Sequence, residues 1–359
     1  MANLDNLEEI SKLDKSNLLG SIEALPKQLM QAWEEISSTA IPPELLNVKN
    51  VVVSGMGGSA LPGRIVDSLI LDRATTPIEV STEYKLPNYV GPDSLVIVSS
   101  YSGGTEETIS ALYDALNKKA KIFVVSTGGK LSELAKAQSL PSYIFTPKFN
   151  PSNQPRMGLG YSIGAVLFLL GKGNYIHLGE SEVESLIAIA EKFVSEYSVR
   201  TPISQNPAKA LANTLKGKAT ILVASEHLVG ISHAFKNQLN ENSKAFAVLF
   251  DIPELNHHLM EGLSNPKEIK PLLEFLFVFS RLYSQPVRKR YPLTAEVVEK
   301  NDISTKTIEL LSESKLEQIF EMLILGEYVS FYLSCLYGID PTPIPWVDYF
   351  KKALLANPH

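Results

Sequence analysis

Residues 51–59 read Val51-Val52-Val53-Ser54-Gly55-Met56-Gly57-Gly58-Ser59. This short β-branched run stops at small residues, and an apolar pattern of helical period follows it. The same arrangement returns at Leu95-Val96-Ile97-Val98-Ser99-Ser100-Tyr101-Ser102-Gly103-Gly104-Thr105. A buried strand that leads through a tight turn into a helix, and then repeats, is typical of a parallel sheet covered by helices.

The two turns also indicate a ligand. Glycine lets the backbone approach an anion closely, and the N-terminus of the following helix turns free N–H groups toward it. Serine and threonine hydroxyls add hydrogen-bond donors. One such turn is common in proteins that bind nothing there, but two on successive strand–helix units predict a single phosphate held from two sides.

The alternation of strands and helices extends over most of the chain. It predicts an α/β fold of two tandem parallel sheets, each flanked by helices on both faces. The expected domains are a helical segment at 1–47, a domain with the two turns at 48–200, and a second domain at 201–359 that begins at a proline-containing linker. We expect strands at 51–54, 78–82, 94–99, 121–126 and 142–146, and again at 219–225, 245–250, 273–279 and 305–310.

Composition narrows the classes of function. The 359 residues carry a net charge of −6 with no basic run, which argues against nucleic-acid binding. The single cysteine, Cys335, excludes an internal disulfide and fits a reducing cytoplasm. The N-terminus lacks the apolar core of a signal peptide, and no apolar run has the length that a membrane helix needs. We therefore expect a cytoplasmic protein with no membrane partner.

Three further segments carry groups capable of chemistry. Glu241 ends an amphipathic helix, where the helix dipole raises the pKa of a carboxylate modestly, the useful direction for a general base. Arg156 precedes a buried helix and could pair with a phosphate or polarise a sugar oxygen. His257 and His258 are adjacent, but neighbouring side chains on a helix diverge by about 100°, so we expect an acid or base and no metal site. Taken alone, each of these groups also has an ordinary structural interpretation.

The first turn also allows a dinucleotide site. Gly55, Gly57 and Ala60 match the G-x-G-x-x-A fingerprint, and Glu79 or Glu83 could hold a ribose. The hydroxyls of this turn and the whole second turn have no role in such a site. A nicotinamide-dependent oxidoreductase is therefore the weaker hypothesis.

Taken in order, the motifs resemble those of a known enzyme family, the bifunctional phosphoglucose/phosphomannose isomerases, which carry two tandem sugar isomerase (SIS) domains. The likeness runs from about residue 48 to the C-terminus. It implies interconversion of fructose 6-phosphate with glucose 6-phosphate, and with mannose 6-phosphate, through a cis-enediol and without metal or redox cofactor. The motifs are Gly55-Met56-Gly57-Gly58-Ser59, Ser100 to Thr108, Gln154-Pro155-Arg156, Asn240-Glu241-Asn242, Pro253 to His257 and Gly338 to Pro343.

The resemblance also implies residue roles. Glu241 would be the base that moves a proton between C1 and C2, and Arg156 would stabilise the charge that develops on the oxygens. His257 would help to open the sugar ring. Its partner would be Lys351 or Lys352, which the sequence leaves open, and we favour Lys351. In the family this histidine comes from the neighbouring subunit, which implies a homodimer whose active site is completed across the interface. The phosphate would be bound by Gly57, Ser59, Ser100, Ser102 and Thr105.

Some positions depart from the family pattern. Gly104 and His258 stand where we expect Asn, and relatives tend to carry Pro-Ala in the segment that here reads Ser243 to Ala247. None of these is the implied base, but they leave open the balance between glucose and mannose epimers. A sugar-phosphate sensor without turnover is the alternative function. The two turns alone would be enough for a sensor to bind its ligand, whereas Glu241 and His257 would have no role in such a protein.

Overall fold

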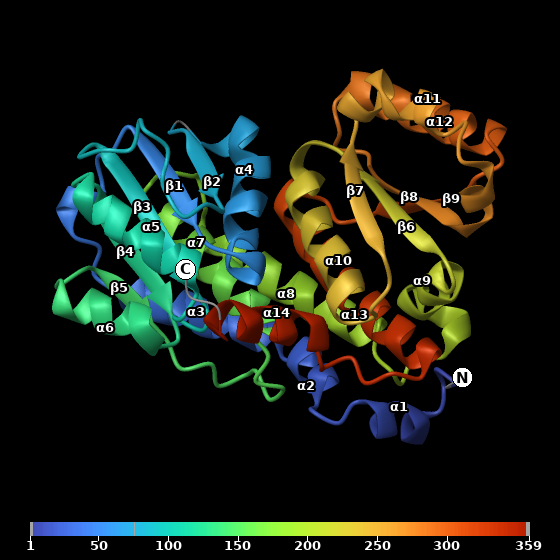
Figure 1. Ribbon diagram of the computed structural model, residues 1–359, viewed down its shortest axis with the longest axis horizontal. Helices are drawn as coiled ribbons and strands as arrows, with labels where there is room; N and C mark the ends of the chain where they lie inside the picture. Colours follow the sequence, from blue (N-terminus) through green and yellow to red (C-terminus); the bar gives the residue numbers. More distant parts are fainter. Residues whose placement is uncertain (1–2, 75, 357–359) are drawn as a thin grey trace.

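The computed structural model describes residues 3–74 and 76–356. Two parallel sheets lie side by side with helices packed against each of them (Figure 1). The strand order is β2-β1-β3-β4-β5 in the first sheet and β7-β6-β8-β9 in the second, which confirms the predicted fold class. The strands are β1 (Asn50–Ser54), β2 (Ile78–Ser81), β3 (Ser94–Ser100), β4 (Lys121–Ser126), β5 (Ser142–Ile144), β6 (Ala219–Ala224), β7 (Ala247–Asp251), β8 (Leu273–Ser280) and β9 (Ser304–Leu310).

The described residues form fourteen α-helices besides short 3₁₀ turns. The last helix, α14, was not indicated by the sequence pattern. The helices are α1 (Leu7–Leu13), α2 (Leu18–Glu23), α3 (Leu25–Ser38), α4 (Leu61–Arg73), α5 (Glu106–Asn117), α6 (Gly129–Ala137), α7 (Leu159–Lys172), α8 (Glu180–Glu196), α9 (Pro207–Leu215), α10 (Val229–Glu241), α11 (Leu259–Gly262), α12 (Gln285–Lys300), α13 (Lys315–Tyr337) and α14 (Pro345–Ala356).

The first sheet is buried on both faces. Val51 and Val53 of β1 belong to the large core that includes α4 and α7, whereas Val52 belongs to a separate core with α5 and α6. Successive side chains of a strand point to opposite faces, so a strand covered on both sides is apolar at every position. This is why an unbroken valine run identified the strand.

The N-terminal helices pack into the rest of the chain. α3 lies along α7, and the side chain of Gln28 donates to the carbonyls of Phe149 (2.9 Å) and Met157 (3.0 Å). Further along the chain, the fully buried ammonium of Lys209 on α9 is 2.9 Å from the carboxylate of Asp5. The N-terminal segment therefore contacts both halves of the molecule.

The longest helix, α13, runs through the interior and contacts α8, α9 and α10. By length and hydropathy alone it could cross a membrane, but every residue of its apolar stretch is buried inside the protein. The sequence expectation that no apolar run reached this length was therefore wrong. The helix is apolar all round because protein surrounds it on every side.

The two sheets share one core at their junction. α4 of the first sheet packs on α10 of the second, and the N–H of Gly230 donates to the Ser68 hydroxyl (2.8 Å). A Cβ atom at Gly230 would lie 2.3 Å from the carbonyl oxygen of Arg64, so only glycine permits this approach. α14, red in Figure 1, crosses the front of both halves.

Candidate active site

The two glycine-rich turns lie side by side at the carboxyl edge of the first sheet. β1 and β3 are parallel neighbours, with Ser54 opposite Val98. The backbone N–H of Tyr101 donates to the hydroxyl of Ser59 (3.0 Å), so a hydrogen bond joins one turn to the other. The paired turns that the sequence indicated are therefore adjacent in space.

The second turn has a fixed shape. The hydroxyls of Ser100 and Thr105 are 3.0 Å apart, and the N–H of Gly103 donates to Ser100 Oγ (3.1 Å). Gly103 has a φ of +67°, and a Cβ there would lie 1.8 Å from the carbonyl oxygen of Gly128. Ser102 is exposed at the tip, where its hydroxyl accepts the N–H of Gly104 at 3.4 Å. Thr105 begins α5 without capping it through its side chain, so side-chain capping does not occupy the first N–H groups of that helix.

Arg156 is held by four hydrogen bonds. It lies in the 3₁₀ turn η3 (Pro155–Met157), and its Nε donates to Asn242 Oδ1 (2.8 Å). Nη1 donates to Gln154 Oε1 (3.2 Å), and Nη2 donates to the carbonyls of Pro341 (3.1 Å) and Thr342 (2.6 Å). Of the five guanidinium N–H groups, one on Nη1 is left without a partner among residues 3–74 and 76–356. A rigid guanidinium with one spare donor is suited to bind an anionic oxygen.

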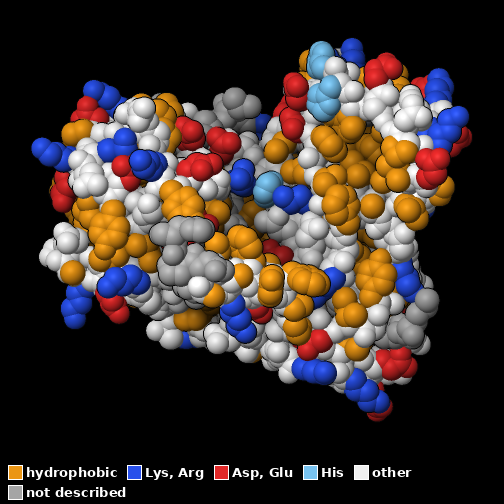
Figure 2. All heavy atoms as spheres, viewed as in Figure 1, with side chains coloured by type: hydrophobic (Ala, Val, Ile, Leu, Met, Phe, Trp, Pro, Cys, Tyr) orange, Lys and Arg blue, Asp and Glu red, His pale blue; other side chains and the backbone are white. Residues whose placement is uncertain are grey.

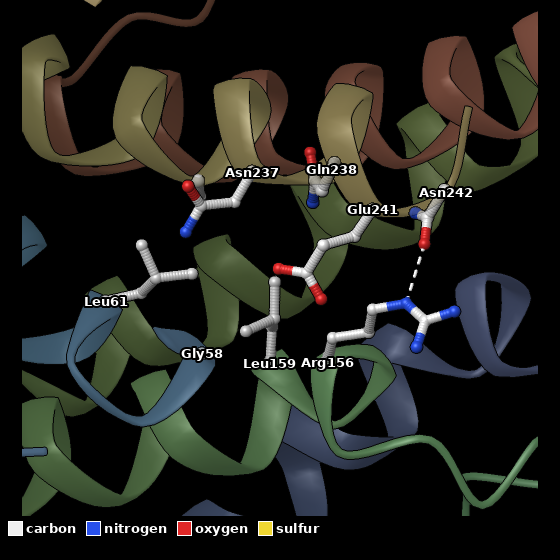
Figure 3. Close-up of a pocket in the computed structure, with 9 residues that line it drawn as sticks. Gly58, Leu61, Arg156, Leu159, Asn237, Gln238, Glu241 and Asn242 are labelled. Atoms are coloured by element: carbon white, nitrogen blue, oxygen red, sulfur yellow. Dashed lines mark hydrogen bonds between the residues drawn. The ribbon is translucent and has the colours of Figure 1, made fainter. Parts of the chain in front are cut away.

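Glu241 is the last residue of α10, and its carboxylate points into a cleft between the two halves of the molecule (Figure 3). Within the described part of the chain no hydrogen bond to this carboxylate is found. Burial raises the pKa of Glu241, and the nearby charges of Arg156, Lys351 and Lys244 oppose that rise. The direction is the one expected from the helix end, but burial is its main cause.

The cleft brings the base to the first turn. It is narrow and open to solvent. A Cβ atom at Gly58 would lie 3.8 Å from Cα of Arg156, so this turn touches the arginine segment directly. The lining residues are Gly58, Leu61, Arg156, Leu159, Ala234, Asn237, Gln238, Glu241 and Asn242.

Several basic groups lie around the cleft. Figure 2 shows basic side chains and a histidine in the hollow between the two lobes. Burial, together with Lys236 and Arg64, lowers the pKa of His233 to about 4. Burial and Arg156 lower the pKa of Lys244 to about 8, and its ammonium donates to the Pro341 carbonyl (2.7 Å). Such a cleft favours an anionic ligand.

Lys351 lies on α14, where it is exposed and close enough to Glu241 to act on its charge. Lys352 is not among the charges that act on Glu241. The same helix exposes Trp346 (82%), Tyr349 (68%) and Phe350 (61%) to solvent. Of the two lysines, Lys351 is therefore the one whose charge acts on Glu241, although neither lines the cleft.

His257 does not meet the other candidates within the chain. It ends the 3₁₀ turn η6 (Glu254–His257) beyond the carboxyl end of β7, and it is exposed. Glu241 lies before the amino end of the same strand. A strand rises about 3.3 Å per residue, so the five residues of β7 alone span about 17 Å. His258 is also exposed on that side.

Several lining residues were missed by the sequence reasoning. Ala234, Asn237, Gln238 and Glu241 recur at helical spacing, so one face of α10 lines the cleft. The apolar stripe on another face of this helix drew attention instead. Neither amide atom of buried Gln238 has a hydrogen-bond partner within residues 3–74 and 76–356. Among the described residues, no three His, Cys, Asp or Glu side chains are grouped so as to hold a metal ion.

Two family models match the chain. Residues 44–157 match the SIS domain, and residues 204–354 match the bacterial phospho-glucose isomerase C-terminal SIS domain. A solved structure of a hypothetical protein from Thermus thermophilus has the same fold, with a TM-score of 0.74 at 16% identity, and the match covers 98% of this chain and 92% of that one.

Curated relatives match over nearly the whole length. The bifunctional phosphoglucose/phosphomannose isomerase of Caldicellulosiruptor bescii is 34% identical over 336 residues, which cover 93% of this chain and 98% of the relative. The protein of the same name from Aquifex aeolicus is 31% identical, over 90% of this chain and 94% of its own. At this identity and coverage, the chain belongs to the bifunctional phosphoglucose/phosphomannose isomerase family.

Proposed function

We propose that this protein interconverts fructose 6-phosphate with glucose 6-phosphate and with mannose 6-phosphate. The observation that carries the proposal is the cleft in which the carboxylate of Glu241, the fixed guanidinium of Arg156 and the first glycine-rich turn come together. An aldose–ketose isomerisation needs one base close to two neighbouring carbons and a cation or donors at their oxygens. The relatives give no support to a sensor without turnover.

In the proposed mechanism the substrate phosphate binds at the paired turns, through the hydroxyls of Ser59, Ser100, Ser102 and Thr105 and the backbone at Gly57. Binding there fixes the sugar far from the reacting carbons, so it orients C1 and C2 without taking part in the proton transfer. Gly57 has a positive φ (+51°). Among the described residues no atom beyond its chain neighbours lies within 4 Å of its Cβ position, so there is open space at the first turn.

The proton transfer is assigned to Glu241. Its carboxylate takes a proton from the carbon next to the carbonyl, which gives a cis-enediol, and returns a proton to the neighbouring carbon. Burial raises the pKa of Glu241 and so makes it a stronger base than an exposed carboxylate. Arg156 places its spare N–H at the enediolate oxygens, where negative charge develops.

Ring opening is assigned to Lys351 and to His257 of a second subunit. Within one protomer His257 lies beyond the carboxyl end of β7, away from Glu241. We therefore propose a homodimer whose two sites each take a histidine from the partner. A matched pair tests the lysine: Lys351→Met should lower kcat about tenfold, and Lys352→Met should leave it unchanged. Equal losses would contradict the assignment.

The direct test of the activity is an NMR assay that starts from fructose 6-phosphate and shows both aldose products at once. We expect glucose 6-phosphate and mannose 6-phosphate to appear, with no requirement for nicotinamide and no effect of EDTA. Activity that EDTA removes and a divalent ion restores would contradict the metal-free mechanism. We also propose a cytoplasmic location, which fits a chain whose single cysteine, Cys335, rules out an internal disulfide.

A further inference from the structure

Asn242 joins the cleft to the central helix α13. Its side chain is fully buried directly after Glu241. On one side its Oδ1 accepts Nε of Arg156 (2.8 Å), and on the other its Nδ2 donates to Ser330 Oγ (3.1 Å). Ser330, also fully buried, donates in turn to the carbonyl of Glu327 (3.0 Å).

The hydrogen bonds from Arg156 through Asn242 to Ser330 form a relay. In each of them the donor and the acceptor are determined. An arginine Nε can only donate, so the amide must present its oxygen to Arg156 and its nitrogen to Ser330. A serine hydroxyl has one proton, and here it goes to the carbonyl of Glu327, which leaves the oxygen lone pairs free to accept from Asn242. The relay therefore specifies one orientation of the amide, and that orientation specifies where Arg156 lies.

Arg156 shares a cleft with Glu241 but does not pair with it. Among the described residues no ion pair joins the two groups within 4.0 Å, although the arginine is the largest favourable charge acting on the carboxylate. The other bonds of the guanidinium go to Gln154 and to the carbonyls of Pro341 and Thr342. Only Asn242 holds Nε, on the α10 side of the group (Figure 3).

We propose that Asn242 is a positioning residue, braced by Ser330, that holds the guanidinium of Arg156 beside Glu241 without letting the two groups pair. The inference rests on the proposed function, in which Glu241 acts as a free base. A carboxylate paired with arginine is a weaker base, because the pair stabilises its charged form. Without the acceptor at Asn242, Arg156 would be free to turn its Nε toward the carboxylate.

Other charges face these groups and must stay constant in a test. The charges of Lys351 on α14 and Lys244 after α10 lower the pKa of Glu241. Those of Asp348 and Asp340 raise the pKa of Arg156. None of them makes a hydrogen bond to the side chain of Asn242 or Ser330 among the described residues. Substitutions in the relay therefore change the placement of Arg156 and leave the surrounding charges in place.

The experiment measures the titration of the Glu241 carboxyl by ¹³C NMR on glutamate-labelled protein, with Glu241→Gln to assign the signal. It is run together with the pH profile of kcat/KM. Asn242→Ala should lower the pKa of Glu241 by about one unit, as a new pairing with arginine does. The acid limb of activity should move to lower pH by the same amount, while the plateau falls about tenfold.

Ser330→Ala should lower the pKa of Glu241 by a smaller amount, because the amide of Asn242 stays next to Arg156 but loses its hydrogen bond to Ser330. Ser334→Ala is the matched control, since Ser334 is also fully buried on α13 and donates to a carbonyl three residues back, that of Phe331 (2.6 Å), without contact to Asn242. It should shift neither the titration nor the acid limb. Asn242→Asp keeps an oxygen for Arg156 and should not lower the pKa of Glu241.

An unchanged titration of Glu241 in folded Asn242→Ala would overturn the proposal, as would equal shifts in Ser330→Ala and Ser334→Ala. A wild-type protein that does not isomerise sugar phosphates would refute the proposed function instead. The NMR titration would still decide whether Asn242 keeps the two charges apart.

Discussion

The first sheet meets the cleft at Gly58, in the turn that follows the carboxyl end of β1, whereas the second sheet meets it with the C-terminal end of α10, next to the amino end of β7. Parallel α/β sheets bind ligands beyond the carboxyl ends of their strands, and the first sheet follows that rule. In the second sheet the same edge carries His257, which does not reach the cleft of its own chain. Repeating one architecture has therefore not repeated one site: in the proposed mechanism one sheet supplies donors for the phosphate, and the other supplies the base.

The largest expected effect tests the second sheet. Glu241→Gln should lower kcat by about 10³-fold or more, because the proton-transferring group is lost. Binding of fructose 6-phosphate, measured by calorimetry, should change little, because the phosphate is held by the other sheet. Turnover near the wild-type rate would show that Glu241 is not the base and that the two sheets do not divide binding and proton transfer between them.

The next effect tests the carboxyl edge of the second sheet. Glu241→Gln and His257→Gln should each be inactive alone, but a mixture refolded together should regain about a quarter of wild-type activity. Half of a random mixture is heterodimer, and each heterodimer has one site with both wild-type residues. No recovery in a mixture that demonstrably forms heterodimers would mean that His257 does not complete the partner's site.

A smaller effect tests the first sheet. Ser102→Ala should raise KM about tenfold and change kcat less, because it removes a binding group remote from the reacting carbons. Gly104→Asn should act in the opposite direction, since it adds a donor at a position where a Cβ meets no atom within 4 Å. Steady-state kinetics on fructose 6-phosphate distinguishes the two. A fall in kcat at constant KM in Ser102→Ala would contradict a binding role.

The smallest effect is on stability. The pKa of Glu241 is raised in the folded protein, so the fold favours the protonated carboxyl. This contribution is complete below the unfolded pKa of about 4.5 and is lost as pH rises through the folded value. Glu241→Gln should therefore be more stable than wild type at pH 8, by on the order of 1 kcal/mol, and the gain should vanish below pH 4.5. Thermal unfolding across this range checks it, and a gain independent of pH would contradict the cause.

The fold was largely predictable because its signals are local. The valine run of β1 and the glycine turn after it identify a buried strand and its exit within nine residues. The packing of the two halves against each other could not be predicted. It depends on contacts such as that of Gly230 with Arg64, which leave no periodic pattern in the sequence. α14 was missed since its exposed aromatic residues do not form the buried stripe that reveals a helix.

The candidate site divides in the same way. Glu241, Arg156 and the two turns were found from motif and resemblance. Glu241, Arg156 and Gly58 of the first turn line one cleft, and a hydrogen bond from Tyr101 to Ser59 joins the second turn to the first. Asn242 was noted only as part of a motif and Gln238 was not found, because their contacts arise only when α10 packs against α13 and against the arginine turn. His258 remains unexplained, since it is exposed and distant from the cleft within one chain.

The exposure of Trp346 gives the protein an optical reporter of its own. The chain has two tryptophans, and the other, Trp33, is partly buried and packs edge-on against Phe168 at 5.1 Å. Their emission should therefore differ in colour, with Trp346 the redder of the two. Trp346 shares a helix with Lys351. Quenching or a blue shift of its emission on mixing the protein with fructose 6-phosphate would therefore report in real time that this helix becomes covered, without any label.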